Sequence, residues 1–430
     1  MTIRIQSVRS RQILDSRGRP TVEADVTLEG GHTGRASVPS GASTGSAEAH
    51  ELRDGDPQLY AGLSVLHAVG HVNGIIAQAL QGFDGLDQVG LDHVLVSLDG
   101  TPQLSRLGAN AILAVSIAAA RATAVAQGQS LYERVQAIAG NTALSMPVPM
   151  VNILSGGLHA GRGMDVQDFL AMPVRAGSVA EAIHILSRVR NAATEEARAR
   201  GLPTLLADEG GISPGLPTGR DALEMMMRII ERAGLQPGQD VVIAIDVAAT
   251  ALQAEGGGYA LQREGRQIAS VQMIEMLADW VRDFPVVSIE DGLGEEDWTA
   301  WAELTRRIGH RVQLVGDDLF TTHPQRLDRG IREHVANGVL VKANQNGTLS
   351  GTIALIAQAK AAGYATIVSA RSGETEDAFM SDLAVGTGAG QIKIGSLRTS
   401  STVAKYNQLL RIEEASAAPY WGLSALTGRA

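Results

Sequence analysis

Cysteine is absent from the 430 residues of the chain. Its absence excludes disulfide bonds, thiolate metal ligands and a cysteine nucleophile, and it fits a reducing cytoplasm, which is the location we expect. Aromatic residues are scarce, at 3% of the chain, and no basic run offsets a formal net charge of −10. Because a nucleic-acid surface needs positive charge and stacking side chains, we expect no nucleic-acid partner.

Long uncharged hydrophobic runs are missing as well. Charges interrupt the apolar runs of residues 1–18, so we expect neither a secretory signal nor a membrane anchor there. The longest apolar candidate, residues 110–128, includes Arg121 and several hydroxyl groups, which indicates a buried helix rather than a membrane span. With 44% hydrophobic residues the chain can build a large core, and we expect a soluble protein with no membrane partner.

The first part of the chain, residues 1–139, begins with alternating strand patterns and continues into helices rich in alanine and leucine. Strands followed by helices are typical of an α+β domain. Between them lies a long stretch of small polar residues, SVPSGASTGSAEAHELRDGD, at positions 37–56. Loops of this length are commonly functional lids or disordered segments. We therefore predict an α+β domain whose long polar loop is either a functional lid or a disordered segment.

In the second part, residues 140–430, the pattern of predicted helices and strands changes. PVPMVNIL and FLAMPV supply two early strands, and helical stretches then alternate with seven short apolar segments. These are TLLADEGG, VVIAIDVA, VVSIEDGL, VQLVGDDL, GVLVKANQ, TIVSARSG and GQIKIGS. The alternation predicts a closed parallel (β/α)8 barrel ringed by helices, so the fold class is α/β. An open doubly wound sheet is the alternative, disfavoured because no GxGxxG turn follows an early strand.

Charged residues stand at the ends of these seven segments. In a barrel they would converge at the carboxyl-terminal mouth, where barrel enzymes place their chemistry. A single one could be a helix cap, but seven successive strands ending in charge indicate a site. So many acidic groups around one opening repel one another unless cations neutralise them. The residues are Asp208, Glu209, Asp246, Glu290, Asp291, Asp317, Asp318, Lys342, Arg371 and Lys393.

Three consecutive strands supply the carboxylates of Asp246, Glu290 and Asp317. These are hard oxygen ligands without an accompanying histidine or cysteine cluster, so the set favours Mg²⁺. Asp291 and Asp318 are weaker candidates, because adjacent residues of a strand point to opposite faces.

Two lysines, Lys342 and Lys393, follow on later strands. Desolvation and a neighbouring cation both disfavour a charged amine, so a lysine beside Mg²⁺ can act as a base. The alternative is that each lysine pairs with a carboxylate across the mouth. Glu209, expected on the opposite side of the barrel, would be the complementary acid. A base and an acid facing each other over a metal suit an elimination or a proton transfer.

The segment TIVSARSGETED, residues 366–377, delivers an arginine and two hydroxyl groups to one patch. Arg371, Ser369 and Ser372 would together bind an anionic ligand. Ala370, in the middle of this patch, offers no functional group.

Ten segments make the chain resemble the enolase family over essentially its whole length. They are LDSRGRPTVEADV, PSGASTG, ELRDGD, GANAILAVSIA, SMPVPMVNIL, DEGG, SIEDGL, VGDDLF, ARSGETED and VAKYNQLLRIEE. The resemblance implies an N-terminal capping domain followed by an enolase-type barrel, with two Mg²⁺ per active site. It also implies a small phosphorylated or phosphonylated carboxylate as substrate and assembly into a homodimer or octamer.

The resemblance also implies roles for individual residues. Lys342 would take the proton from C2 of a 2-phosphoglycerate-like substrate, and Glu209 would assist departure of the C3 hydroxyl. The Mg²⁺ that binds the substrate carboxylate would be held by Asp246, Glu290 and Asp317, and Ser43 would bring a lid oxygen to a second Mg²⁺. The phosphate would be held by Arg371 and Ser372, with Lys393 near the substrate carboxylate. The pocket would be lined by His159 and Gln167. For His159 a purely structural role is the alternative.

Several positions depart from the family pattern. Ala370 stands where the family has histidine, Ala343 where it has phenylalanine, and Asp168 where it has the longer glutamate. Ile394 replaces a threonine, and residues 398–402 lack the arginine pattern of the family. Most of these changes place a smaller or less polar group around the substrate. We therefore expect Ala370 and Ala343 to determine specificity, and Asp168 to contact the substrate.

Three hypotheses follow. The first is an enolase-like enzyme of phosphonate biosynthesis that accepts a larger phosphorus group, such as carboxyphosphonoenolpyruvate synthase of the phosphinothricin type. A void left by the missing imidazole is costly if empty and useful if a substrate fills it. The second is an ordinary glycolytic enolase that converts 2-phospho-D-glycerate to phosphoenolpyruvate and water. The third, a non-catalytic binding protein, gives no reason to keep the base, the acid and three metal ligands.

Overall fold

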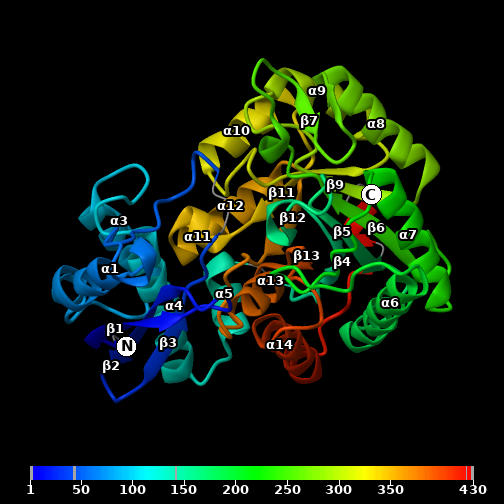
Figure 1. The fold of residues 1–430 in the computed structure, drawn as a ribbon. Coiled ribbons are helices and arrows are strands. Elements are labelled where there is room, and N and C mark those ends of the chain that lie inside the picture. The colour runs from blue at the N-terminus through cyan, green and yellow to red at the C-terminus, as the bar shows by residue number, and fades with distance from the viewer. Residues whose placement is uncertain (1–2, 42–44, 141–142, 423, 428–430) are drawn as a thin grey trace.

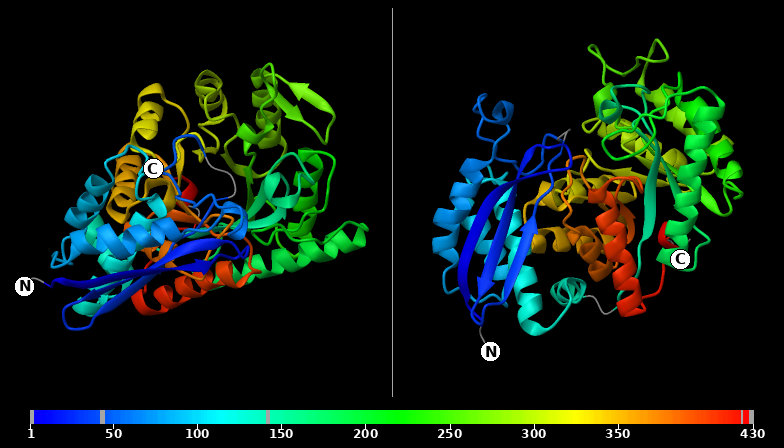
Figure 2. Two further views of the ribbon diagram at one scale, coloured as in Figure 1. Left: turned by 60° about the vertical axis from the view of Figure 1, so that its left-hand side comes forward. Right: turned by 60° about the horizontal axis from the view of Figure 1, so that its bottom comes forward.

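The computed structural model describes residues 3–41, 45–140, 143–422 and 424–427. It has two parts that lie side by side, an N-terminal sheet with its helices and a barrel ringed by helices (Figure 1). The two further views show the N-terminal part against one side of the barrel (Figure 2). The expected order of a capping domain followed by a barrel is confirmed.

The N-terminal sheet has three antiparallel strands, β1 (Ile5–Leu14), β2 (Pro20–Leu28) and β3 (Thr33–Ser37). Helix α4 (Ala109–Gln127) packs on β2 and β3. Gly34 permits this close approach, because a Cβ there would lie 2.2 Å from the carbonyl oxygen of Ala118. In the described part of the chain, α4 is the one helix long and apolar enough to cross a membrane, and 83% of its apolar window is buried inside the fold. The prediction of a buried helix is confirmed.

The other N-terminal helices begin and end at ordinary signals. Asp87 Oδ1 accepts a hydrogen bond from Gly90 N at the start of α3, and Ser130 forms a capping box with Glu133 at the start of α5. Gly140 ends α5 in the left-handed conformation. The elements are η1 (Tyr60–Gly62), α1 (Leu66–His71), the π-helical η2 (Val72–Ile76), α2 (Ala77–Leu80), α3 (Gln88–Asp99) and α5 (Leu131–Ala139).

Eight strands close the barrel in the order β10-β11-β12-β13-β4-β5-β6-β9. Most are buried along their whole length, as their continuous apolar runs predict. They are β4 (Val148–Ser155), β5 (Asp168–Pro173), β6 (Val241–Asp246), β9 (Val286–Glu290), β10 (Gln313–Gly316), β11 (Gly338–Val341), β12 (Ala365–Ser369) and β13 (Gly390–Lys393).

Helices surround the barrel, and a small hairpin, β7 (Tyr259–Leu261) with β8 (Arg266–Ile268), lies outside it. The helices are η3 (Leu158–Ala160), α6 (Val179–Ala199), α7 (Gly219–Arg232), η4 (Ala249–Leu252), α8 (Ser270–Asp283), α9 (Trp298–Ile308), α10 (Pro324–Glu333), α11 (Ala343–Asn346), α12 (Leu349–Ala361), α13 (Phe379–Thr387), α14 (Ser400–Ser416) and α15 (Ser424–Thr427).

The expectation of an all-parallel barrel is wrong for one strand. β5 pairs antiparallel with both β4 and β6, while the other barrel pairs are parallel. β4 and β5 are joined by residues 156–167 without a crossover helix of ordinary length. A connection that returns directly gives an antiparallel neighbour, because a parallel one needs a longer crossover.

The prediction of a strand at TLLADEGG, residues 204–211, is also wrong. These residues lie in the connection between α6 and α7 and form isolated bridges there. Leu205 is 74% exposed and Leu206 is 43% exposed, so the apolar run faces outward instead of joining the sheet. The position beside β6 that such a strand would take is occupied by β5.

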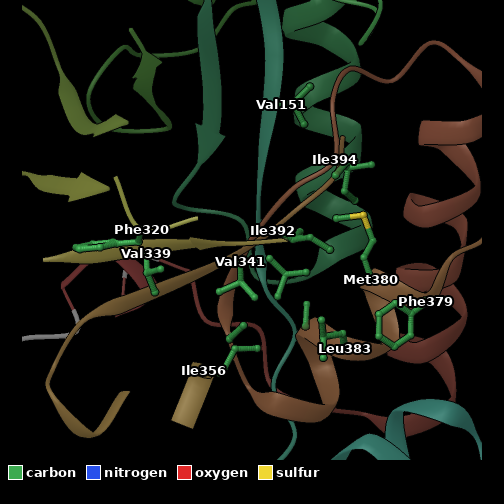
Figure 3. Close-up of a cluster of buried hydrophobic side chains, with 14 of the residues drawn as sticks. Val151, Phe320, Val339, Val341, Ile356, Phe379, Met380, Leu383, Ile392 and Ile394 are labelled. Carbon is green, nitrogen blue, oxygen red and sulfur yellow. The ribbon is translucent and has the colours of Figure 1, made fainter. Parts of the chain in front are cut away.

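Buried apolar side chains join the barrel to its helices (Figure 3). Phe379, Met380 and Leu383 of α13 share this cluster with Val341 of β11 and Ile392 of β13. Burying one such side chain contributes roughly 1.5–3 kcal/mol. This packing fixes the carboxyl ends of β11 and β13, where Lys342 and Lys393 lie.

The two parts of the chain meet through polar contacts near β12. Arg121 of α4 makes two hydrogen bonds of 2.6 Å with the carboxylate of Asp377. Ser40, at the start of the predicted lid, forms an antiparallel bridge with Gly373. These contacts bring the lid segment next to the carboxyl end of β12, where Arg371 lies.

Candidate active site

Lys393 lies between two of the predicted metal ligands. Its Nζ is 2.8 Å from Asp246 Oδ2 and 2.7 Å from Glu290 Oε2. Asp246 and Glu290 end the neighbouring strands β6 and β9, where they are register partners. β13 is separated from β6 by β4 and β5, so closure of the barrel brings the lysine to the two acids.

Burial and these ion pairs set the protonation of the three groups. Burial alone would raise the pKa of Asp246, but the charge and hydrogen bond of Lys393, together with Glu290 and Lys342, lower that pKa. The pKa of Glu290 is raised well above its usual range, first by burial and then by the charge of Asp246. Burial would lower the pKa of Lys393, but both carboxylates raise it. Lys393 therefore favours the charged form of Asp246, while burial and the charge of Asp246 favour the protonated form of Glu290.

A second acidic group lies just past the ends of β9 and β10. Asp291 accepts hydrogen bonds from the backbone N–H of Asp317 at 2.9 Å and of Asp318 at 2.8 Å. Its φ of 42° is left-handed, which turns its carboxylate toward the neighbouring strand end. The rule of alternating faces, from which Asp291 and Asp318 were ranked lower, does not apply here because both residues lie outside the strands.

These acids form the tightest carboxylate cluster of the described residues. The ligand atoms of Asp291, Asp317 and Asp318 all lie within 4.8 Å of one another, whereas Asp246 and Glu290 pair with Lys393. Burial, with help from neighbouring carboxylates, raises the pKa of Asp291 well above its usual range and the pKa of Asp318 to about 7. Hard oxygen donors with such like-charge repulsion fit a divalent cation such as Mg²⁺.

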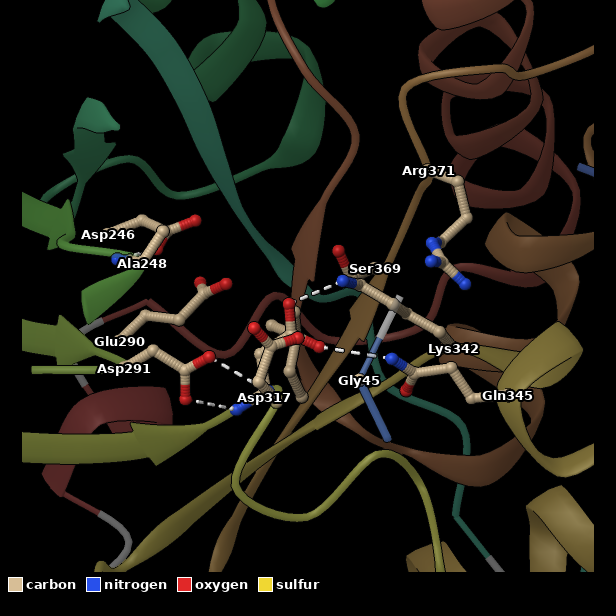
Figure 4. Close-up of polar contacts among 12 residues, drawn as sticks. Gly45, Asp246, Ala248, Glu290, Asp291, Asp317, Lys342, Gln345, Ser369 and Arg371 are labelled. Atoms are coloured by element: carbon tan, nitrogen blue, oxygen red, sulfur yellow. Dashed lines mark hydrogen bonds and ion pairs between the residues drawn. The ribbon is translucent and has the colours of Figure 1, made fainter. Parts of the chain in front are cut away.

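Lys342 pairs directly with Asp317. This contact agrees with the alternative interpretation, in which each lysine pairs with a carboxylate across the mouth. Burial would lower the pKa of Lys342, but the Asp317 carboxylate outweighs it and the pKa is raised. A neutral amine therefore requires a cation that takes up the charge of Asp317. Figure 4 shows Asp246, Glu290 and Asp291 on one side, Lys342, Gln345 and Arg371 on the other, and Asp317 between them.

Glu209 reaches the barrel from a loop rather than from a strand. Its Oε2 accepts a hydrogen bond from Asn152 Nδ2 of β4 at 3.0 Å. Asp168, the first residue of β5, faces the same space: burial and then the charge of Glu209 raise its pKa well above the usual range. Ser155 Oγ donates to Asp168 Oδ1 at 2.6 Å. Because β12 and β13 separate β4 from β11, Glu209 and Lys342 approach the mouth from different sides.

Gln167 and His159 lie at the same opening. Gln167 Nε2 donates to Asp246 Oδ2 at 3.1 Å. His159 belongs to η3, and its carbonyl oxygen is 3.4 Å from the backbone nitrogen of Asp208. Its buried Nδ1 has no hydrogen-bond partner within the described ranges. A buried ring nitrogen without a partner is free to bind a ligand.

Arg371 and Ser372 follow β12 and meet two residues that sequence analysis did not assign. Arg371 Nη1 lies 3.0 Å from Glu48 Oε2. Ser372 Oγ accepts a hydrogen bond from Arg17 Nη1 at 3.1 Å. The side chains of Arg371 and Arg17 are 4% and 9% exposed. Two largely buried guanidinium groups therefore lie beside the patch where an anionic group is expected.

The two alanines predicted to determine specificity lie in different places. Ala370 is 8% exposed and donates its backbone N–H to the carbonyl of Lys393 at 2.8 Å, so it belongs to the mouth. Ala343 lines a cavity of about 30 Å³ together with Leu113 and Phe379. Lys342 and Arg371 do not line that cavity, but Ser369 and Asn344 do, so the space at Ala343 lies between the two parts of the chain and next to the mouth.

Sequence analysis did not assign four residues that contact the site. Arg17 lies in the LDSRG motif, Glu48 in the lid stretch, and Asn344 and Gln345 directly after Lys342. Glu48 is the first of four acidic residues in that stretch, and nothing in the sequence distinguishes it from the other three. Ser43, the expected ligand of a second Mg²⁺, lies outside the described residues.

Two family models match the chain. The one described as Enolase, N-terminal domain matches residues 5–135, and the one described as Enolase, C-terminal TIM barrel domain matches residues 143–428. Each falls within one of the two parts of the fold, and together they cover nearly the whole chain.

Proposed function

Since the chain belongs to the enolase family and is an enzyme of that superfamily, we propose that it acts with Mg²⁺ on a 2-phosphoglycerate or phosphoenolpyruvate skeleton. The observation that supports this proposal is the meeting of charged residues from the ends of six barrel strands at one mouth. Acids that repel one another, lysines beside them and a buried arginine are the groups that such a reaction needs.

In this proposal Lys342 Nζ accepts the proton from C2, and the electron pair of that bond moves toward the carboxylate carbon. Glu209 donates a proton to the C3 hydroxyl, which leaves as water while the C2–C3 double bond forms. Mg²⁺, held by Asp246, Glu290 and Asp317, would supply positive charge for the second negative charge that develops on the carboxylate. Proton abstraction and loss of water are thus assigned to groups from different sides of the mouth.

The same proposal places the phosphorus group at Arg371 and Ser372, with Lys393 toward the substrate carboxylate. His159 and Gln167 line the opening, and Asp168 contacts the substrate beside Glu209. The assembly we propose is a homodimer or octamer, as the family suggests.

We further propose specialisation for a larger phosphorus group, as in carboxyphosphonoenolpyruvate formation. Ala370 supports this, because it puts a methyl group in the buried wall where the family has an imidazole. An empty void there would cost stability, whereas a substrate group can fill it. Ala343 gives weaker support, since Lys342 and Arg371 do not line the cavity beside it. The ordinary hydratase is the competing function.

Proton abstraction and dehydration are measured separately. The purified protein is incubated with Mg²⁺ and 2-phosphoglycerate in deuterated water, and NMR follows deuterium at C2 and phosphoenolpyruvate formation. We expect C2 exchange with slow dehydration, and a new phosphorus signal when phosphonoformate is added. Lys342→Met should abolish the exchange. Fast dehydration without a phosphonoformate product would establish the ordinary hydratase, and no exchange at all would refute both functions.

A further inference from the structure

Glu48 belongs to the N-terminal part of the chain but places its carboxylate in the barrel mouth. It is 8% exposed. Its Oε2 lies 3.0 Å from Arg371 Nη1, and its Oε1 lies 3.3 Å from Arg371 Nη2. The same Oε1 accepts hydrogen bonds from the backbone N–H of Gly45 at 2.9 Å and from Gln345 Nε2 at 3.1 Å. Both oxygens therefore have partners, and the two-point, end-on contact through Nη1 and Nη2 constrains the orientation of the guanidinium.

Gln345 extends this contact to the acidic cluster. Its Nε2 also lies 3.3 Å from Asp317 Oδ1, and its Oε1 accepts a hydrogen bond from Thr322 Oγ1 at 2.6 Å. Asp317 in turn pairs with Lys342. One hydrogen-bonded chain thus runs from the arginine expected to bind the phosphorus group, through Glu48 and Gln345, to the expected base.

The segment around Glu48 is anchored on both sides. The backbone N–H of Ala49 donates to the carbonyl of Gln345 at 2.9 Å, and Gln103 Nε2 donates to the carbonyl of Glu48 at 3.0 Å. The carboxylate is therefore presented by a held backbone and not by a free loop tip.

We propose that Glu48 is a positioning residue that sets the orientation of Arg371 and, through Gln345, the orientation of Asp317. This inference rests on the proposed function for the identity of the ligand that Arg371 binds. Asn344 Oδ1 lies 3.0 Å from Arg371 Nη1 and cannot replace the charge of Glu48, because it is a neutral acceptor. Without that charge, the guanidinium is drawn toward the next carboxylate, Asp317, and away from the substrate.

The chain offers a matched control. Arg121 and Asp377 also form a carboxylate–guanidinium pair between the two parts of the chain, with two contacts of 2.6 Å. No hydrogen bond described for either side chain reaches Lys342, Asp317 or Arg371 within the described residues. Asp377→Asn therefore weakens the contact between the two parts without touching the chain that Glu48 builds.

The test compares Glu48→Gln, Glu48→Asp and Asp377→Asn in the full-length protein. For Glu48→Gln we expect at least roughly tenfold weaker binding of 2-phosphoglycerate in calorimetry and a higher KM for C2 exchange, as loss of a charged hydrogen bond predicts. Glu48→Asp should recover part of the affinity because it restores the charge. Asp377→Asn should lower the melting temperature and leave the KM unchanged. Equal KM changes in Glu48→Gln and Asp377→Asn would overturn the inference.

A readout without substrate separates this inference from the proposed function. Phenylglyoxal labels accessible guanidinium groups, and peptide mass spectrometry measures the rate at Arg371. We expect slow labelling in the wild type, faster labelling in Glu48→Gln and Glu48→Asp closer to the wild type. Unchanged labelling in a folded Glu48→Gln protein would overturn the positioning role. Failure of the wild type to bind 2-phosphoglycerate, with the labelling difference present, would refute the ligand and retain the role of Glu48.

Discussion

The two halves of the barrel mouth handle negative charge in opposite ways. In the half formed by β6, β9 and β13, Lys393 lies between Asp246 and Glu290 and compensates them. In the half beyond β9 and β10, three aspartates gather within 4.8 Å, and Lys342 pairs with one of them. The first half carries its own counter-charge in Lys393, whereas in the second half three carboxylates face one lysine. Asp317 belongs to the second half and is also one of the three ligands proposed for Mg²⁺, so the comparison teaches where added positive charge should have the larger effect.

The largest effect should come from removing the internal cation. Lys393→Met leaves Asp246 and Glu290 buried without the cation that pairs with both, so we expect a loss of about 3–5 kcal/mol in the free energy of unfolding. Urea unfolding without Mg²⁺ measures it. Lys342→Met should cost less, because Lys342 pairs with one carboxylate and Lys393 with two. Equal losses would show that the two halves do not differ in this way.

Mg²⁺ should stabilise the folded protein through the acidic half of the mouth. Binding to the folded state at a concentration of 100 Kd stabilises it by about 2.7 kcal/mol. We expect this gain in the wild type, and a much smaller gain in Asp317→Asn, which removes a charge from the acidic half. Thermal unfolding across a Mg²⁺ series measures both. A full gain in Asp317→Asn would place the metal elsewhere.

The acidic half should also make the free energy of unfolding of the metal-free protein depend on pH. Asp318 keeps its proton up to about pH 7 in the folded state, whereas an unfolded carboxyl loses it near about pH 4. Between these values the folded state binds more protons, so its stability falls as pH rises, by at most about 1.4 kcal/mol per pH unit for one group.

Urea unfolding at several pH values measures this slope. Asp318→Asn should make it shallower between about pH 4 and pH 7, because the contribution of one titrating group is gone while Glu290, Asp291 and Asp168, whose pKa values are also raised, remain. Saturating Mg²⁺ should reduce it in the wild type, since the cation favours the charged carboxylate. A slope that Asp318→Asn leaves unchanged would assign it to another group.

The smallest effect should come from a residue outside both halves. Ala343→Val adds two methyl groups toward the cavity of about 30 Å³ and should change the free energy of unfolding by less than about 1.5 kcal/mol. The KM for 2-phosphoglycerate should stay unchanged, because Lys342 and Arg371 do not line that cavity. Steady-state kinetics measures it. A changed KM would return Ala343 to the list of specificity residues.

Local patterns were enough for most of the barrel. Short apolar runs such as VVIAID and VVSIE form buried strands because a parallel barrel strand is covered on both faces. The charged residues that follow them meet at one mouth because the ends of parallel strands share one rim. The same reasoning failed at residues 204–211, where an apolar run is exposed and the acid Glu209 nevertheless reaches the mouth from a loop.

The sequence by itself determined the fold class, the family and the composition of the mouth, because periodicity and motif order are properties of neighbouring residues. The tertiary structure alone decided the antiparallel direction of β5, the left-handed turn that brings Asp291 to Asp317, and the meeting of Glu48 with Arg371. Each depends on which distant segment lies next to a side chain. Charge and burial act through space, so that information is absent from the order of residues along the chain.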